Sequence, residues 1–279
     1  MDRFERICRD IKEVKIQGAR AVAEAAVKAL LIRHDKAAVN KLIHLRQTEP
    51  CLQNAVNFVL SHENMEEGAS NALKILHSDD KIAKIGAGLI KNGMTVFTHC
   101  HSSAVMSILL EAKRQKKKFS VFCTETRPLF QGRITAAQLA KAKIPVTLFV
   151  DSAARIALKK SDIVFFGCDA ITPTHVYNKI GSELFAIIAS RYDIPLYVAT
   201  GSWKFDANGI YGKEPGIEER PAKEIWPNAP KGIKISNMAF EKIDTSLIEG
   251  VVSELGLLSM DMFIGEVRKK YPFIFKKTV

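Results

Sequence analysis

Reactive side chains follow several short apolar runs in this sequence, at positions where they can form one site. Cys100 comes after the run Thr95–Thr98, and Asp169 comes after Ile163–Gly167. A thiolate can remove a proton from carbon, and a carboxyl group in apolar surroundings keeps its proton to higher pH and can act as an acid. The two residue types together suit acid–base chemistry on a small molecule.

Each of these residues also has a structural explanation. Cys100 stands where a strand is expected to give way to a helix, and the positive end of a helix favours a thiolate, so we expect a lowered pKa. His99 or His101 would strengthen this effect if either is cationic. The alternative for Cys100 is a buried thiol at a strand end, and the alternative for Asp169 is a helix cap or an Asx turn.

Basic and hydroxyl side chains follow the other apolar runs. Arg127, Lys179 and Lys204 can bind a phosphate or stabilise a developing oxyanion, although lysine and arginine are common in loops. Ser102 opens an expected helix, where it either caps the helix or belongs to a phosphate site built from backbone N–H groups. Arg155 is more simply explained as a helix-surface residue.

The sequence gives no support for a metal or a nucleotide cofactor, and we expect neither. The motifs GxGxxG and GxxxxGK[ST] are absent. The side chains of residues 99–101 should diverge at a strand end, which does not suit a metal. No CxxC pair occurs among the five cysteines, which favours a reducing compartment: Cys8, Cys51, Cys100, Cys123 and Cys168.

The chain divides near Asn92-Gly93. Residues 1–92 show helical periodicity and predict a helical domain. Residues 93–279 alternate short apolar runs with amphipathic stretches and predict a Rossmann-like α/β domain with a mainly parallel sheet. The predicted strands are 95–98, 120–124, 146–150, 163–167, 196–199 and 248–252. The predicted helices are 104–115, 136–142, 153–159, 180–191 and 260–269, and residues 201–245 are expected to be irregular.

Ligands of such sheets bind beyond the carboxyl ends of the strands. We therefore expect the polar segments after the first five strands to lie along one rim.

The formal net charge of +11 favours an anionic ligand. Part of it lies in runs such as 116–118 and 269–270, for which a solvated surface is the simplest explanation. Since no nucleic-acid-binding motif accompanies the charge, we expect a phosphorylated small molecule rather than nucleic acid. No apolar run approaches the ~18–20 residues of a membrane span, and the first residues lack a signal-peptide core, so we expect a cytoplasmic protein.

Several motifs resemble archaeal ribose-1,5-bisphosphate isomerases, closely over residues 95–205 and loosely elsewhere. These enzymes share a superfamily with methylthioribose-1-phosphate isomerases and with the regulatory α, β and δ subunits of translation initiation factor two-B. The motifs are THCHSSAV (98–105), TETRPLFQGRITAAQLA (124–140), VDSAAR (150–155), GCDAI (167–171), NKIGS (178–182) and WKF (203–205).

The resemblance implies an aldose–ketose isomerase in which Cys100 and Asp169 are the acid–base pair. Asp169 would protonate the ring oxygen, and Cys100 would move a proton from C2 to C1 through an enediolate. The resemblance further implies a homo-oligomer, either a dimer or a hexamer, and a role in nucleotide metabolism, in AMP degradation. The residues that it implies for substrate binding are Asn178, Lys179 and Lys204, with Gly18, Ala19 and Arg20 in a phosphate-binding segment.

Two residues depart from the family pattern. Gln17 and Glu49 stand where arginines are expected, and Arg20 or Arg46 can substitute for them. The substrate therefore stays open between ribose-1,5-bisphosphate and a related sugar 1-phosphate.

Three alternatives also remain. A non-catalytic regulatory protein related to initiation factor two-B fits the positive charge and the two departures. Methylthioribose-1-phosphate isomerases usually have a longer N-terminal domain and a TCN-type motif at the cysteine. The third alternative is a general binding protein for sugar or nucleotide phosphates on the same fold.

Overall fold

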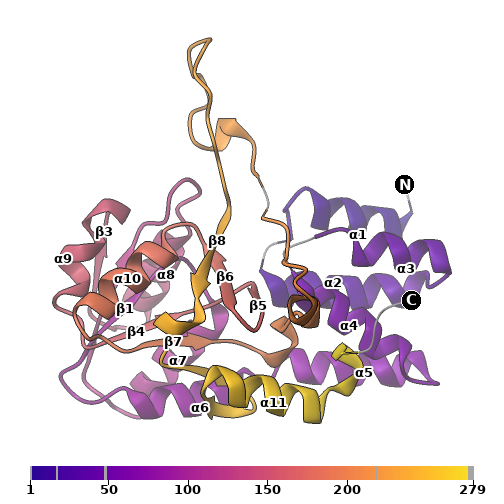
Figure 1. Cartoon of the computed structure of the whole chain (residues 1–279), viewed down its shortest axis with the longest axis horizontal. Coiled ribbons are helices and arrows are strands. Elements are labelled where there is room, and N and C mark those ends of the chain that lie inside the picture. Colours follow the sequence, from indigo (N-terminus) through magenta and orange to yellow (C-terminus); the bar gives the residue numbers. More distant parts are fainter. Residues whose placement is uncertain (1, 17, 47–48, 218, 276–279) are drawn as a thin grey trace.

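The computed structural model describes residues 2–16, 18–46, 49–217 and 219–275. The N-terminal region is helical, as predicted, and lies to one side of the sheet (Figure 1). Gly18 separates the first two helices with a positive φ of 86°, which glycine adopts without strain. The N-terminal helices are α1 (Arg3–Lys12), α2 (Ala19–Ile32), α3 (Lys36–Ile43), α4 (Pro50–Leu60), α5 (Met65–Leu76) and α6 (Asp79–Leu89).

A seven-stranded sheet forms the centre of the remaining chain, with the strand order β10-β9-β7-β4-β1-β2-β3. All neighbours are parallel except β10, which runs antiparallel to β9. The predicted α/β fold with a mainly parallel sheet is thus confirmed. Its strands are β1 (Thr95–Thr98), β2 (Ser120–Thr124), β3 (Val146–Phe149), β4 (Ile163–Phe166), β7 (Leu196–Ala199), β9 (Gly250–Ser253) and β10 (Gly256–Leu258).

Helices connect these strands close to the predicted positions. The rings of buried Phe97 on β1 and Phe166 on the neighbouring β4 pack edge-on, with a distance of 6.4 Å between their centroids. The helices are α7 (Ser103–Arg114), α8 (Gln131–Lys141), α9 (Ala154–Leu158), α10 (Ser182–Arg191) and α11 (Met260–Lys270).

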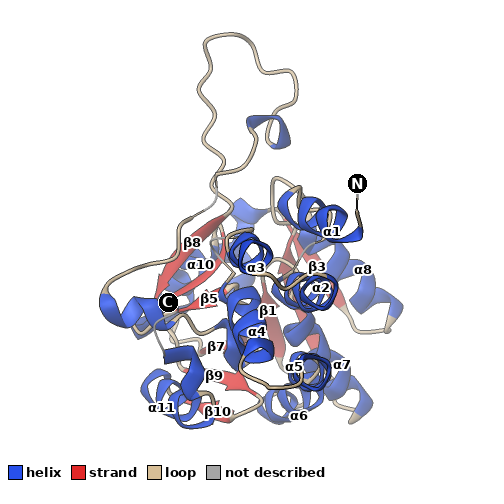
Figure 2. Cartoon of the chain, turned by 90° about the vertical axis from the view of Figure 1, so that its right-hand side faces the viewer, coloured by secondary structure: helices blue, strands red, loops and turns tan. Residues whose placement is uncertain are grey.

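A second, antiparallel sheet was not predicted. It has the order β5-β6-β8, formed by β5 (Ala170–Ile171), β6 (His175–Lys179) and β8 (Phe240–Asp244). Asn178 and Lys179, which the sequence placed in a loop, therefore lie on a strand. Irregular structure was expected over residues 201–245; the described residues from 205 to 239 contain no regular element other than short 3₁₀ turns, but 240–244 form strand β8, and part of the irregular segment projects away from the body of the protein (Figure 2).

The helical region and the main sheet share a continuous core. Buried residues of α2 and α4 belong to the same hydrophobic cluster as Ile171 on β5 and as Cys168 and Trp203, which follow strands of the α/β region. Helix α6 packs along α7, where Ile82 and Ala87 join the cluster around Ile108. None of the described helices is both long and apolar enough to cross a membrane.

Substitution of two glycines in α6 can test how closely this helix packs against α7. A Cβ atom on Gly86 would lie 2.3 Å from Cδ1 and 2.5 Å from Cγ1 of buried Ile108, whereas a Cβ atom on Gly88 would meet nothing within 4 Å. Gly86→Ala should lower the free energy of unfolding by about 1–3 kcal/mol through overpacking. Gly88→Ala should raise it by about 0.5–1 kcal/mol through helix propensity.

Urea denaturation of both variants measures these changes. Equal effects of the two substitutions would contradict the close approach of α6 and α7.

Candidate active site

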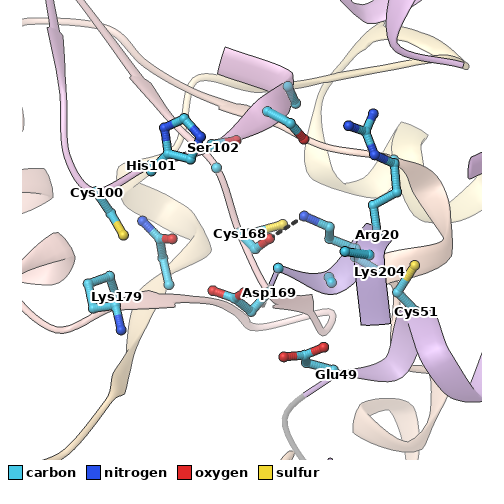
Figure 3. A pocket seen from close by; sticks show the side chains of 18 of the residues that line it. Arg20, Glu49, Cys51, Cys100, His101, Ser102, Cys168, Asp169, Lys179 and Lys204 are labelled. Atoms are coloured by element: carbon cyan, nitrogen blue, oxygen red, sulfur yellow. Dashed lines mark hydrogen bonds between the residues drawn. The ribbon is translucent and has the colours of Figure 1, made fainter. Parts of the chain in front are cut away.

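A large cavity opens at the carboxyl edge of the main sheet, between that edge and the N-terminal helices. Its volume is about 480 Å³. Figure 3 shows that its side chains come from both parts of the chain. Nine of the ten site residues proposed from the sequence line it: Gly18, Ala19, Arg20, Cys100, Ser102, Asp169, Asn178, Lys179 and Lys204.

The strand order brings Cys100 and Asp169 to this cavity. β1 and β4 are neighbours, but the chain runs from β1 to β2 on one side and from β4 to β7 on the other. Doubly wound sheets form their ligand crevice at such a switch point. Cys100 lies two residues beyond β1, and Asp169 lies three residues beyond β4. Gly167 permits the close approach of these loops, because a Cβ atom there would lie 2.5 Å from Oγ of Ser102.

Arg127 does not line the cavity. Its Nη2 donates a hydrogen bond to the carbonyl of Ile225 at 3.1 Å, and its guanidinium lies 5.0 Å from the ring centroid of Phe130. Asp151, which follows β3, accepts hydrogen bonds from the backbone N–H groups of Thr126 and Arg127 at 2.8 and 2.7 Å. The segment after β3 thus supports the loop after β2.

Cys100 adopts a left-handed backbone conformation, with φ of 65°. Two threonine hydroxyls hold it there: its N–H donates to Oγ1 of Thr126 at 3.0 Å, and its carbonyl accepts from Oγ1 of Thr135 at 2.8 Å. Such a conformation costs energy for a residue with a side chain, and it recurs at functional sites. The surrounding hydrogen bonds therefore fix the direction in which the thiol points.

Burial raises the pKa of the Cys100 thiol to about 11, although the Lys179 charge and a backbone hydrogen bond from His101 favour the thiolate. The nearby Asp169 carboxylate adds to the rise. The predicted lowering of this pKa was wrong. Helix α7 begins only at Ser103 and is capped by Ser102, and the burial of the thiol outweighs the helix dipole, whose effect is limited to the first turn.

The two flanking histidines do not supply positive charge. Burial lowers the pKa of His99 to about 4, and its Nε2–H donates to the carbonyl of Ile180 at 3.0 Å. Burial also lowers the pKa of His101. Because Thr135 Oγ1 donates its proton to the Cys100 carbonyl, His101 Nδ1, 2.9 Å away, must itself donate to Thr135. Nε2 of this neutral, cavity-lining His101 is thereby left as a proton acceptor.

Asp169 has a raised pKa, as expected from its place after an apolar strand. Burial causes the rise, and the charges of Lys204, Lys179 and Arg46 oppose it. Its backbone N–H donates to the carbonyl of Tyr177 at 2.8 Å, so strand β6 holds the loop in place. The carboxyl group therefore keeps its proton to higher pH than an exposed aspartate and suits the role of a general acid.

Lys204 is held beside Asp169. Its Nζ donates to the carbonyl of Cys168 at 2.6 Å. Burial opposes its charge, but Cys168 and Asp169 favour it and raise the pKa of the ammonium group overall. Lys204 therefore provides a fixed positive charge at the acid.

Glu254 anchors the short turn that carries Lys204 and was missed in the sequence. Its buried carboxylate accepts hydrogen bonds from the backbone N–H of Ser202, at 3.1 Å to Oε2, and from the Ser202 hydroxyl. Glu254 directly follows β9, so its position after a strand was a usable signal. Arg220, Glu224 and Asn237 also line the cavity, but they come from the irregular segment and carried no such signal.

Carboxylates accompany the arginines of the cavity. Arg20 bonds to Asp79, and Arg46 pairs with Glu49 at 3.0 Å, where both side chains are buried. Glu49, placed where an arginine was expected, is thus compensated by Arg46. Gln17 lies outside the described residues.

Asn178 and Lys179 face the cavity from β6. Nδ2 of Asn178 donates to Oγ of Ser182 at 2.9 Å, and Nζ of Lys179 lies 4.9 Å from the ring centroid of Phe240. Across the described residues, His, Cys, Asp and Glu side chains form no group of three that suits a metal ion. What the cavity offers is a carboxyl group with a raised pKa, a thiol, a neutral imidazole and two lysine side chains.

The raised pKa of Cys100 can be tested by alkylation. Since the thiolate is the reactive form, iodoacetamide should label Cys100 slowly at pH 7, and the rate should rise about tenfold per pH unit up to pH 10. Mass spectrometry of digested protein assigns the label, with Cys100→Ser as the control for the cavity cysteines Cys51 and Cys168. A rate that is already independent of pH at pH 7 would show a lowered pKa instead.

A protein-family model described as the initiation factor 2 subunit family matches residues 12–260. Among curated proteins, the chain is 37% identical to ribose 1,5-bisphosphate isomerase of Methanocaldococcus jannaschii, over 92% of each protein. It is 35% identical to methylthioribose-1-phosphate isomerase of Thermosipho africanus, over 83% of this chain and 72% of that protein.

Solved structures show the same fold. Translation initiation factor eIF-2B of Pyrococcus horikoshii superposes with a TM-score of 0.82 at 25% identity, over 93% of this chain and 98% of that one. The 5-methylthioribose 1-phosphate isomerase of the same organism gives a TM-score of 0.74 at 19% identity, over 96% of this chain and 88% of that one. With the family model covering most of its length, this chain belongs to the initiation factor 2 subunit family.

Proposed function

We propose that the protein is an aldose–ketose isomerase that acts on a ribose with a phosphate at C1, with ribose-1,5-bisphosphate as the leading substrate. The observation that carries the proposal is the convergence of Cys100 and Asp169 in one cavity at the switch point of the sheet. The names of several relatives support it, because ribose 1,5-bisphosphate isomerases of Methanocaldococcus jannaschii and Archaeoglobus fulgidus are 37% and 34% identical to this chain.

In the first half-reaction, Asp169 donates its proton to the ring oxygen as the bond from C1 to that oxygen breaks. The thiolate form of Cys100, a minor species at neutral pH because burial raises the pKa of the thiol to about 11, removes the proton from C2, and the released electron pair forms the C1–C2 double bond. Lys179 lies where its charge favours the thiolate, and Lys204 stabilises the Asp169 carboxylate that results.

In the second half-reaction, the Cys100 thiol returns its proton to C1. The hydroxyl proton on C2 passes to the Asp169 carboxylate, which leaves a ketone at C2. Asp169 and Cys100 are then back in their starting protonation states. The hydrogen moves within one molecule, so the reaction as written uses no redox cofactor. The raised pKa of Asp169 matches this double use as acid and base.

Two helix N-termini at the cavity suit the phosphate groups. Gly18 caps α2 without a side-chain hydrogen bond, so the first N–H groups of this 14-residue helix remain for an anion. Arg20 lies on the first turn of the same helix. The start of α7 at Ser102 provides the second candidate position.

The reaction is tested by following α-ribose-1,5-bisphosphate by NMR for the appearance of ribulose-1,5-bisphosphate. Cys100→Ser and Asp169→Asn should each lower kcat at least about 10²-fold, because each removes a proton-transfer group. Cys8→Ser and Asp35→Asn are matched controls, since Cys8 is buried in the core beside α2 and Asp35 caps α3. Both controls should retain activity.

Ribose 1-phosphate and methylthioribose-1-phosphate belong in the same assay, because they differ from the bisphosphate only at C5. If the protein converts only one of these two sugars, the proposed mechanism stands and that sugar replaces the bisphosphate as the proposed substrate. Equal turnover by the wild type and both cavity variants would remove the proposed roles. Absence of isomerisation with all three sugars would favour the non-catalytic alternative, which the likeness to an initiation factor structure makes the second candidate.

A further inference from the structure

Most of the chain's excess positive charge lies on the edge of the main sheet opposite the cavity. Four segments there lead into β1, β2, β3 and β4, and we call them together the basic edge: residues 91–94, 113–119, 141–145 and 159–162. They hold ten of the 41 Lys and Arg residues of the chain but one of its 30 Asp and Glu residues. This small part of the sequence thus supplies nine of the formal charges that make up the net +11.

The basic edge is one continuous surface. Its segments belong to four neighbouring strands, in the order β4-β1-β2-β3. Direct contacts join them: the N–H of Gly93 donates to the carbonyl of Lys118 at 2.7 Å, and Nζ of Lys113 donates to the carbonyl of Lys143 at 2.8 Å. Asp162, the acidic member, accepts from the N–H of Thr95 at 2.7 Å. Fixed backbone contacts therefore hold the lysines on one side of the molecule.

The cavity itself has no comparable excess. Among the described residues that line it, five cationic side chains face five carboxylates: Arg20, Arg46, Lys179, Lys204 and Arg220 against Glu49, Asp79, Asp169, Glu224 and Glu254. The net charge of +11 favoured a phosphorylated substrate as its binding partner. The structure places most of this charge away from the substrate cavity, so the substrate does not account for it.

The composition of the basic edge indicates the kind of partner. Its large apolar side chains Phe119 and Ile144 are buried, with 7% and 2% of their surface exposed, and none of the large exposed hydrophobic residues of the described chain lies in it. A stable protein interface needs apolar or aromatic anchors, and a membrane-surface element inserts an apolar face. A phosphate backbone needs only cationic groups.

We propose that the basic edge binds double-helical nucleic acid through its phosphates, independently of sequence. Four strands about 4.8 Å apart span about 14 Å, which is enough to reach phosphates on both sides of a groove about 12 Å wide. The basic edge has no exposed aromatic side chain to stack on unpaired bases, and phosphates are common to RNA and DNA duplexes, so the two duplexes should bind with similar affinity. This proposal does not depend on the isomerase activity, because the two sites share no residue.

Fluorescence anisotropy with a labelled 20-base-pair duplex and the full chain tests the proposal. The basic-edge variant changes Lys91, Lys118, Lys159 and Lys160 to Gln. The control variant makes the same change in charge elsewhere, at Lys12, Lys28, Lys231 and Lys234. All eight lysines are exposed, so both variants should fold, which thermal melts verify.

At 50 mM salt the wild type and the control variant should bind with a dissociation constant in the micromolar range. The basic-edge variant should bind at least about tenfold more weakly. The slope of log K against log salt should also become shallower by about 0.9 for each lost phosphate contact. RNA and DNA duplexes of one sequence should differ by less than about threefold.

Three results would overturn the proposal. They are equal weakening in both variants, absence of binding at about 100 μM protein and 50 mM salt, and a loss of affinity for phosphatidylglycerol vesicles in the basic-edge variant without a loss for duplex. The last result would assign the edge to a membrane surface.

Discussion

The cavity depends on the reversal of strand order around β1. Because the chain leaves β1 toward β2 and β3 but places β4 and β7 on the other side, two loops diverge at that point and leave space between them. The N-terminal helices cover this space and turn a crevice into an enclosed site. The raised pKa values of the thiol and the carboxyl group follow from that cover, since it removes water from both groups.

Desolvation shifts the pKa values of the acidic and the basic groups of the site in opposite directions. It raises the pKa of Cys100 and Asp169 and lowers that of His99 and His101, so each of these groups is moved toward its neutral form. Lys204 is the exception, because the neighbouring Asp169 and Cys168 outweigh the cost of burying its charge. Burial thus favours the neutral forms of most of these groups and leaves the Lys204 ammonium as a fixed charge beside Asp169.

Local sequence signals predicted the parallel strands and their helices well. β1, β2 and β7 have the predicted bounds, because each is a short apolar run between polar segments. The antiparallel sheet was missed, since β5 has two residues, and β6 is neither an apolar run nor a regular alternation and pairs with β8, some 60 residues later. The prediction of a lowered pKa for Cys100 was wrong for a related reason. The cavity that Cys100 lines is built from distant parts of the chain, so the local sequence does not reveal the burial of the thiol. Nine of the ten site residues proposed from the strand-end rule and the family motifs line the cavity, whereas Arg127 contacts the loop beside it.

The anchoring of Lys204 by Glu254 has a consequence for how the protein is made. The cavity takes residues from Gly18 at one end of the sequence and from Glu254 at the other. During synthesis, the first strands of the sheet can pair while the C-terminal part is still being translated, but β9 and the residue after it arrive almost last. Contacts over such long sequence separations form late and slowly. The nascent chain thus contains the thiol, the acid and the lysine before it contains the glutamate that anchors the lysine's turn.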